Sequence, residues 1–309
     1  MTMDPLSAVL RGMHLSGSIY ATWELRAPWG MDLPGGPFAA FHLVEEGGGW
    51  LRLGRDVHRL EAGELVVLFR GQAHQLTATR TSPAVPLGRL LARHAPVAGV
   101  HRAGGAGELA RLVCGKFAPE GGQDLRMLRG LPPFVHLRRE QLASLPTLRA
   151  LLTSLAHEAS STAPGAATAA ARITDALFVQ VLRALVLDSG EAPPGWLAGL
   201  REPRLAEALH RLHTEPARAW SVAELATQVG MSRTRFATLF QQRIGQPPMT
   251  YLANLRLELV AQRLRDSEES IAEIAHAAGF ASQTGLNRAF RRRFHQPPSA
   301  FRRATRGGA

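Results

Sequence analysis

Apolar residues recur with two different spacings along the chain. Between residues 38 and 118, short β-prone runs are separated by Gly and Pro. Residues 50–53 (WLRL) alternate apolar with polar, and residues 65–69 (LVVLF) form a continuous apolar run, as in a buried strand. Strands at this density, without helical stretches between them, predict a small sandwich or barrel. Before them, residues 1–17 predict one amphipathic helix, whose apolar face is Leu6, Val9, Leu10 and Met13.

Helical spacing begins at Glu140. Two amphipathic helices are predicted, over residues 142–160 and 170–190, and Ser189–Gly190 ends the second. Their apolar faces are Leu145, Leu148, Leu151, Leu152 and Leu155 in the first, and Ile173, Leu177, Phe178, Val181, Leu182, Leu185 and Val186 in the second. Residues 191–196 (EAPPGW) then predict a linker.

The last third of the chain contains an internal repeat, in which residues 221–252 align with residues 270–302. Each copy opens with Ser followed three residues later by Glu, which is the spacing of a capping box at the start of a helix. Each copy then has a turn glycine, Gly230 or Gly279, and the second copy has one residue more than the first within the turn. Each copy ends in Gln-Pro-Pro, where we expect a helix to stop. A short helix, a glycine turn and a second helix predict a helix-turn-helix, so the sequence predicts two of them.

The second copy has a basic outer face. Its two helices bury apolar faces formed by Ile271, Ile274, Ala275 and Ala278, and by Leu286, Ala289, Phe290 and Phe294. Four polar residues lie largely off the second stripe and are available to DNA: Asn287, Arg288, Arg291 and Arg292. Between the copies, residues 250–267 predict a helix of about 17 residues and about 25 Å. A helix of that length would hold the two recognition helices at a separation close to one turn of DNA, about 34 Å.

Charge supports a nucleic-acid partner for this part of the chain. The formal net charge is +11. Residues 201–309 contain 17 Arg and 9 acidic residues, a net of +8, which leaves 19 basic and 16 acidic residues, a net of +3, in residues 1–200. A basic segment behind a nearly balanced one indicates a polyanion-binding module attached to another domain. The alternative is a merely solubilising surface.

Cysteine and hydropathy bear on location. Cys114 is the only cysteine, so an intrachain disulfide is excluded, which fits a reducing cytoplasm. No stretch reaches about 18 uninterrupted apolar residues, so no membrane span is predicted. The N-terminus has an early acid and no long apolar core, unlike a secretory signal. We therefore expect a cytoplasmic protein without a membrane partner.

Both ends of this pattern resemble AraC/XylS-family regulators. Residues 42–44, 47–53, 60–68 and 71–74, with 112–117 and 131–136, resemble the family's cupin-type sensor domain across roughly residues 20–137. The GF-x-S…F-R-x-F…P-x-x-F-R run of the second repeat is similar to the family's DNA-binding domain across about residues 203–304. The resemblance implies an α+β two-domain fold, with an N-terminal cupin-like β-barrel and flanking helices before an all-α double helix-turn-helix. The expected boundaries are 1–192 (barrel about 20–137, helices about 140–189), a linker at 193–202, and 203–309.

The resemblance also implies which residues read DNA. The family's positions fall on Thr234, Arg235, Ala237 and Thr238 in the first recognition helix, and on Gln283, Thr284, Asn287 and Arg288 in the second. Arg can bind guanine, and Asn or Gln can bind adenine, through paired hydrogen bonds. Arg291, Arg292 and Arg293 are expected at phosphates, unless one of the three serves the fold.

A cupin barrel can hold a metal with His and carboxylate ligands, so a divalent metal is a candidate cofactor. The candidates are His42, His58, His74, His101, His136 and Cys114, with Glu45 or Glu46 as a carboxylate. The dense His-x-His of metal-binding cupins is missing, because Leu43 and Val44 follow His42. The effector or metal residues are therefore predicted to be His42, His74 and Cys114, with two alternatives. His42 and His74 would be barrel-lining residues satisfied by hydrogen bonds, and Cys114 would be a small buried hydrophobe rather than a reactive thiol.

The function that the resemblance implies is sequence-specific binding of double-stranded promoter DNA by a transcription regulator, not an enzyme. A small-molecule effector, RNA polymerase and a second copy of the chain are the expected partners. The helices over residues 140–189 would form the dimer contact, or would simply cover the open side of the barrel. The competing hypothesis is a metal-dependent cupin enzyme with an appended DNA-binding domain, and a third is an N-terminal domain that only dimerises.

Overall fold

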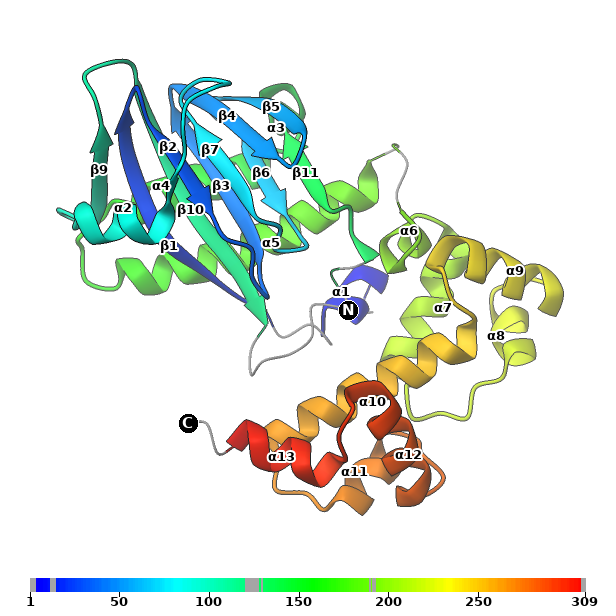
Figure 1. The fold of residues 1–309 in the computed structure, drawn as a ribbon. Helices are drawn as coiled ribbons and strands as arrows, with labels where there is room; N and C mark the ends of the chain where they lie inside the picture. The colour runs from blue at the N-terminus through cyan, green and yellow to red at the C-terminus, as the bar shows by residue number, and fades with distance from the viewer. Residues whose placement is uncertain are drawn as a thin grey trace. The chain divides into compact units, whose positions relative to one another are not determined.

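The computed structural model describes residues 4–11, 15–119, 128, 130–188, 190 and 193–306. The chain forms two compact units. Among the described residues, 15–119, 128 and 130–188 build the sheet-containing unit, and 190 and 193–306 build the helical unit together with the N-terminal segment 4–11 (Figure 1).

The first unit contains two sheets. The larger is ordered β11-β6-β3-β10-β1-β9 and the smaller β5-β4-β7-β2-β8. The strands of the larger sheet are β1 (Leu15–Arg26), β3 (Ala39–Glu46), β6 (Leu65–Leu68), β9 (Val100–Gly104), β10 (Leu109–Pro119) and β11 (Phe134–Leu137). Those of the smaller sheet are β2 (Gly30–Leu33), β4 (Gly48–Leu53), β5 (Asp56–Glu61), β7 (His74–Thr77) and β8 (Val85–Pro86). The two-sheet architecture confirms the predicted β-rich domain.

The core of this unit lies between the sheets. Alternate residues of each strand point to one face, and those on the inner faces are large and apolar, including Trp23, Met31, Val44, Leu51, Leu60 and Leu76. The prediction that no helix lies among the strands was wrong, because Leu87–Arg93 forms α2 between β8 and β9. The prediction of one helix over residues 1–17 was also wrong in its extent. Helix α1 covers only Pro5–Arg11, strand β1 starts at Leu15, and Met13 lies outside the described residues.

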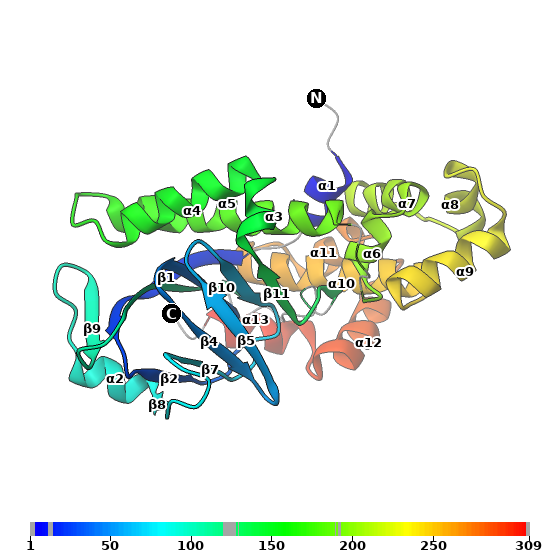
Figure 2. The ribbon, with the colours of Figure 1, turned by 90° about the horizontal axis from the view of Figure 1, so that it is seen from above.

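Three helices complete the first unit and confirm the predicted helical spacer. They are α3 (Arg139–Ala143), α4 (Pro146–Ala159) and α5 (Ala166–Leu187). Helices α4 and α5 pair and run along one face of the larger sheet, where α5 contacts β1 (Figure 2). The approach is closest at Gly17, whose amide donates to Asp175 Oδ1 at 2.7 Å. A Cβ at Gly17 would lie 2.4 Å from Thr174 Cγ2, so a side chain at this position would force the helix away from the strand.

The helical unit contains α1 and eight further helices among its described residues. They are α6 (Trp196–Leu200), α7 (Pro203–Thr214), α8 (Val222–Gln228), α9 (Arg233–Ile244), α10 (Pro248–Asp266), α11 (Ile271–Ala277), α12 (Gln283–Phe294) and α13 (Pro298–Arg306). Helix α1 packs on α7, although residues 1–17 were predicted as part of the N-terminal domain. The stretch predicted as a linker at 193–202 contains α6, and every residue of α6 is buried. Ser189, predicted to help end α5, lies outside the described residues.

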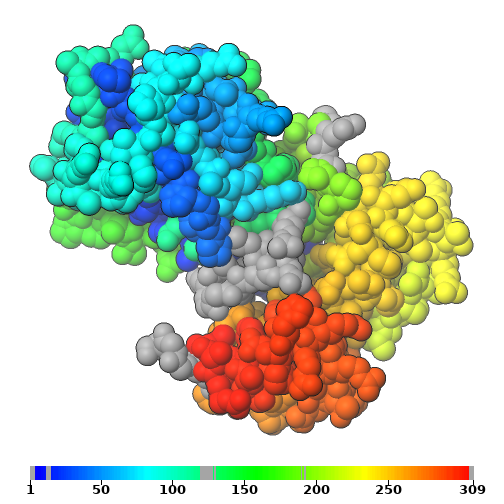
Figure 3. All heavy atoms as spheres, in the orientation of Figure 1, coloured from blue at the N-terminus to red at the C-terminus, as the bar shows by residue number. Residues whose placement is uncertain are grey.

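The two predicted helix-turn-helices are α8–α9 and α11–α12, and they share α10. Tyr251 of α10 packs edge-on against Phe240 of α9, at 5.8 Å between ring centroids. Further along α10, Leu257, Val260 and Leu264 join the core of the second half. Helix α10 therefore supplies an apolar face to both halves. Figure 3 shows the first half in yellow and the second in orange to red.

The predicted role of the Gln-Pro-Pro motifs was partly wrong. Helices α9 and α12 end earlier, in left-handed residues: Gly245 at φ 82° and His295 at φ 59°. The second proline of each motif, Pro248 or Pro298, instead opens the next helix. Proline is favoured in a first turn because its fixed φ suits the helix and its missing N–H has no partner there.

Candidate nucleic-acid interface

Serine residues cap the first helix of each helix-turn-helix, as predicted. Ser221 Oγ accepts a hydrogen bond from the amide of Glu224 at 3.1 Å, and Ser270 Oγ accepts one from Glu273 at 3.2 Å. Only the second copy completes the capping box, because Glu273 Oε2 also accepts from the Ser270 amide at 2.7 Å. That bond lowers the pKa of Glu273. In the first copy the carboxylate of Glu224 instead pairs with Arg218 at 2.5 Å.

The recognition helices α9 and α12 are capped in the same way, which aligns them residue by residue. Ser232 Oγ accepts from the amide of Arg235 at 3.4 Å, and Ser282 Oγ accepts from Gly285 at 3.1 Å. Equivalent pairs are Arg233 with Gln283, Thr234 with Thr284, Arg235 with Gly285, Ala237 with Asn287, and Thr238 with Arg288. Arg233 therefore occupies the position equivalent to the predicted base-reading residue Gln283, although the predicted positions of the first recognition helix begin at Thr234.

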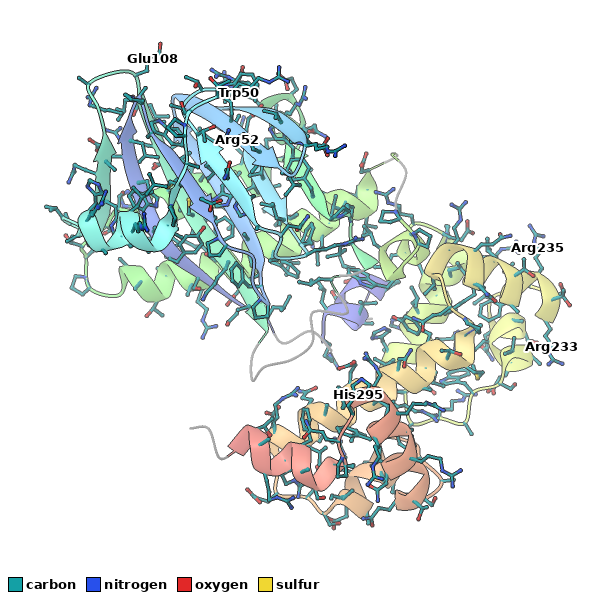
Figure 4. All side chains as sticks on the ribbon, viewed as in Figure 1. Trp50, Arg52, Glu108, Arg233, Arg235 and His295 are labelled. Carbon is teal, nitrogen blue, oxygen red and sulfur yellow. The ribbon has the colours of Figure 1, made fainter. Side chains whose placement is uncertain are left out.

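The predicted DNA-reading residues face solvent, apart from the half-buried Ala237. The exposed ones are Thr234, Arg235, Thr238, Gln283, Thr284, Asn287, Arg288, Arg291 and Arg292. Their side chains make no hydrogen bond or ion pair with another described residue, so all are free to meet a ligand. Figure 4 shows Arg233 and Arg235 projecting from α9 at the edge of the helical unit. The opposite faces of the two helices hold Phe236 and Phe240, or Leu286 and Phe290, in the core.

Arg293 differs from the other arginines of α12 and fits the alternative that one of the three serves the fold. Its Nη2 lies 2.5 Å from Glu258 Oε1 of α10, and its side chain is only 12% exposed. The guanidinium also lies over the ring of Phe294, 5.4 Å from the centroid. Arg293 therefore holds α12 against α10, and the exposed cations of α12 are Arg288, Arg291 and Arg292.

Arg256 of α10 ties the two halves together. Its Nε donates to the carbonyl of Pro216 at 2.7 Å, its Nη2 to that of Arg218 at 2.8 Å, and its Nη1 to that of Gly279 at 3.0 Å. The first two carbonyls precede α8, whereas Gly279 is the turn of the second helix-turn-helix. Gly279 has φ 80°, and a Cβ there would lie 2.5 Å from the carbonyl oxygen of Ala217. The two halves thus meet at this turn.

The candidate effector residues of the N-terminal unit lie in one line rather than around one point. His42 Nδ1 lies 3.1 Å from Cys114 Sγ, and His42 Nε2 lies 2.7 Å from His74 Nε2. His74 Nδ1 donates to the carbonyl of Gln72 at 2.8 Å. The carbonyl can only accept, so the proton of a neutral His74 is on Nδ1 and its Nε2 is an acceptor. His42 Nε2 therefore donates to His74, which leaves His42 Nδ1 to accept a hydrogen bond from the Cys114 thiol.

Burial keeps this chain of hydrogen bonds uncharged. His42 and Cys114 have no exposed surface, and His74 is 4% exposed. Burial lowers the pKa of both histidines and raises the pKa of the Cys114 thiol to about 12. Desolvation disfavours the charged form of each group. The result favours hydrogen-bonded interior histidines and an unreactive thiol.

The three side chains do not fit a metal, because the two nitrogens of His42 face different partners. Within the described part of the chain, no three His, Cys, Asp or Glu side chains are grouped to hold a metal ion. The other candidates are dispersed. His58 packs on Phe134, His101 packs on Trp23, and His136 pairs with Glu64 at 2.8 Å. Glu46 pairs with Arg111 at 2.5 Å.

Comparison with known proteins assigns both units. Residues 4–186 match a family model described as cupin, and residues 225–304 match one described as helix-turn-helix domain. An AraC-like transcription regulator from Streptomyces lividans is 33% identical, over 97% of this chain and 98% of the relative. The chain belongs to the AraC-like transcription regulators. The regulator AlkR of Acinetobacter baylyi is 28% identical to this AraC-like chain, over 97% of it and 99% of AlkR.

One solved structure matches part of this chain. The DNA-binding domain of AdpA, in complex with a target DNA, is 30% identical over 34% of this chain and 96% of that domain, with a TM-score of 0.32. The two family models and the full-length relative show that the AraC-like chain is a DNA-binding transcription regulator with a cupin-like N-terminal domain, as its sequence predicted. No helix among its described residues is long and apolar enough to span a membrane.

Proposed function

We propose that this AraC-like regulator reads promoter DNA with α9 and α12 at once, each helix entering one of two successive major grooves on the same face of the duplex. The observation that carries the proposal is the pair of equally capped helices whose outer faces hold polar side chains without internal partners. Helix α10, with 19 residues, spans about 28 Å, which is close to the rise of one DNA turn. Arg256 supports simultaneous binding, because it joins both halves through three hydrogen bonds.

The two helices would divide the work. Helix α12 presents Arg291 and Arg292 where α9 presents Gln241 and Gln242, so α12 would supply most of the phosphate contacts. Helix α9 presents Arg233 and Arg235 in its first turn, where a guanidinium can bind the O6 and N7 of guanine through two hydrogen bonds. Sequence choice would therefore rest more on α9, and overall affinity more on α12.

Fluorescence anisotropy tests this function. The full chain is titrated into a labelled duplex from upstream of its own gene and into a shuffled duplex of equal length and composition, across a series of salt concentrations. We expect the native duplex to bind at least about a thousandfold more tightly than the shuffled one. Equal affinity for the two duplexes at every salt concentration would remove sequence-specific reading from the function.

We further propose that the protein acts in the cytoplasm as a homodimer, is not an enzyme, responds to a small molecule through its cupin-like domain, and contacts RNA polymerase. Two features support a regulatory rather than a catalytic role: the full-length relatives are named as regulators, and the interior imidazole–thiol chain is satisfied by its own hydrogen bonds. Light scattering of the full chain should give twice the mass of one chain. A monomer at micromolar concentration would contradict the dimer.

A further inference from the structure

A pocket of about 470 Å³ lies between strand β1 and the α4–α5 pair in the first unit. It reaches the space between the sheets, because its lining includes Tyr20, whose hydroxyl is hydrogen-bonded to Cys114, and His101, whose ring packs on Trp23. Its volume is within the range of small-molecule sites, about 300–1,000 Å³.

The pocket exists because the strand and the helices touch at two places and separate between them. At one end, Gly17 is held against α5 by its bond to Asp175. At the other end, Thr22 Oγ1 donates to the carbonyl of Ala159 at 3.2 Å. Between these contacts α5 presents only methyl groups, from Ala167, Ala170 and Ala171. These short side chains leave the space unfilled.

Two residues of the wall, His101 and Glu158, each have a hydrogen-bond acceptor that meets no donor among the described residues. His101 is 8% exposed, and its Nδ1 donates to the carbonyl of His94 at 2.6 Å. In the neutral ring this leaves Nε2 as an acceptor, and no described residue donates to it. The carboxylate of Glu158, at the end of α4, likewise forms no ion pair or hydrogen bond with any residue that the structure describes. Both groups accept hydrogen bonds.

The charge of the pocket lining favours a cationic ligand. The residues that line the pocket include Glu158 but no Lys or Arg, although the whole chain has a net charge of +11. The C-terminal end of α4 and the N-terminal end of α5 both reach the pocket, and their opposite partial charges offset each other. Glu158 therefore contributes the only full charge of the lining if His101 is neutral, and it repels anions and attracts cations.

We propose that this pocket binds a small organic ammonium ion. The ammonium group would pair with Glu158 and donate to His101 Nε2, while the apolar body would lie on the alanine wall of α5. The site can be tested without DNA, so its existence does not depend on the proposed reading of promoters.

Isothermal titration calorimetry of the full chain tests the ligand class. The probes are n-hexylammonium, cyclohexylammonium, benzylammonium and butane-1,4-diammonium, each against a carboxylate of similar shape. We expect saturable binding of at least one amine and none of its matched acid. Glu158→Gln should weaken that binding about tenfold or more, since a charged hydrogen bond is lost. Glu140→Gln, at an exposed residue of α3, should leave the affinity unchanged. Binding by none of the four amines, or equal loss in both variants, overturns the proposal.

A second variant keeps the test independent of charge. Ala167 is exposed and lines the pocket, so Ala167→Leu should fill the cavity without disturbing the fold. Ala176 is exposed on the same helix outside the pocket, which makes Ala176→Leu the matched control. We expect amine binding to be lost in the first variant and kept in the second, with both proteins melting as the parent does. Undiminished binding by Ala167→Leu would place the amine elsewhere.

Discussion

His295 occupies, at the end of α12, the left-handed backbone position that Gly245 occupies at the end of α9. A side chain in this conformation costs about 1–2 kcal/mol, because Cβ approaches the following carbonyl oxygen. Glycine avoids that cost but loses more conformational entropy on folding. The exposed His295 side chain has no hydrogen-bond partner among the described residues that would offset the strain.

We therefore expect His295→Gly to stabilise the helical unit by about 0.5–1 kcal/mol. Urea unfolding followed by circular dichroism measures the change in the free energy of unfolding. Gly245→Ala serves as the reverse variant and should destabilise the same transition. A loss of stability in His295→Gly would mean that the imidazole makes a favourable interaction in solution.

Arg256→Lys should weaken the connection between the two helix-turn-helices. A lysine can donate to one of the three carbonyls at most, so we expect a loss of about 1–3 kcal/mol in unfolding free energy. Affinity for a duplex carrying both half-sites should fall more than affinity for a duplex carrying one. Arg263→Lys is the control, because Arg263 forms only an exposed ion pair with Glu269, at 3.6 Å. Equal loss on both duplexes would show that the halves bind independently.

Replacing Arg291 and Arg292 by Ala should flatten the dependence of DNA affinity on salt. Each phosphate contact contributes a slope of about 0.9 in a plot of log affinity against log salt, so the double variant should lose a slope of about 2. Arg235→Ala should change the slope less and the preference among duplex sequences more. Arg293→Ala should lower stability and leave the slope nearly unchanged, since its guanidinium is bound to Glu258. Anisotropy across a salt series measures all three, and equal slopes would contradict the division between the helices.

His213 should make the helical unit sensitive to acid. Burial lowers its pKa from 6.5 to about 4, and its Nε2 lies 2.7 Å from the hydroxyl of Tyr251. The unfolded chain therefore binds a proton at a higher pH than the folded chain. The contribution to stability is complete above pH 6.5 and is lost as pH falls through about 4, by up to about 3 kcal/mol. His213→Gln should flatten this part of the pH–stability profile, and an unchanged slope would assign it to other groups.

Cys114 should be unreactive in the folded protein. Its thiol has a pKa of about 12 and no exposed surface, so almost no accessible thiolate exists at pH 8. We expect labelling by iodoacetamide to follow global unfolding, and to become fast in 8 M urea. Because burial raises the pKa of the folded thiol above its ordinary value of 9.0, this group stabilises the fold below pH 9, and that stability is lost as pH rises towards 12. Rapid labelling at pH 8 without denaturant would contradict the buried geometry.

The sequence predicted the local structure best where two copies could be compared. The repeat indicated both helix-turn-helices, but aligning them on Gly230 and Gly279 left the turns out of register by one residue. Alignment on the capping serines, Ser232 and Ser282, would have placed Arg233 opposite Gln283 and so among the predicted DNA-reading residues. Arg293 could not be distinguished from Arg291 and Arg292, because only the packing of α12 on α10 brings Glu258 within reach.

The candidate residues of the N-terminal unit were predicted as a group but not as an arrangement. His42 and Cys114 are direct partners in the pairing of β3 with β10, which joins residues far apart in the chain. Spacing along the sequence carries no information about such a register. Strand β1 was missed for a related reason: its apolar residues are interrupted by Gly17 and Ser18, and it is held by long-range pairing with β10 and β9.

Because α1 belongs to the helical unit, the chain passes between the two units twice. The chain begins in the helical unit with α1 on α7, continues into the sheets, and returns after α5. A fragment that starts at residue 193 therefore lacks Ala8 and Val9, which are buried in the full chain, and its α7 surface would be left open to water. Separating the DNA-binding half for study requires supplying residues 4–11 again, for example through a flexible linker ahead of α6.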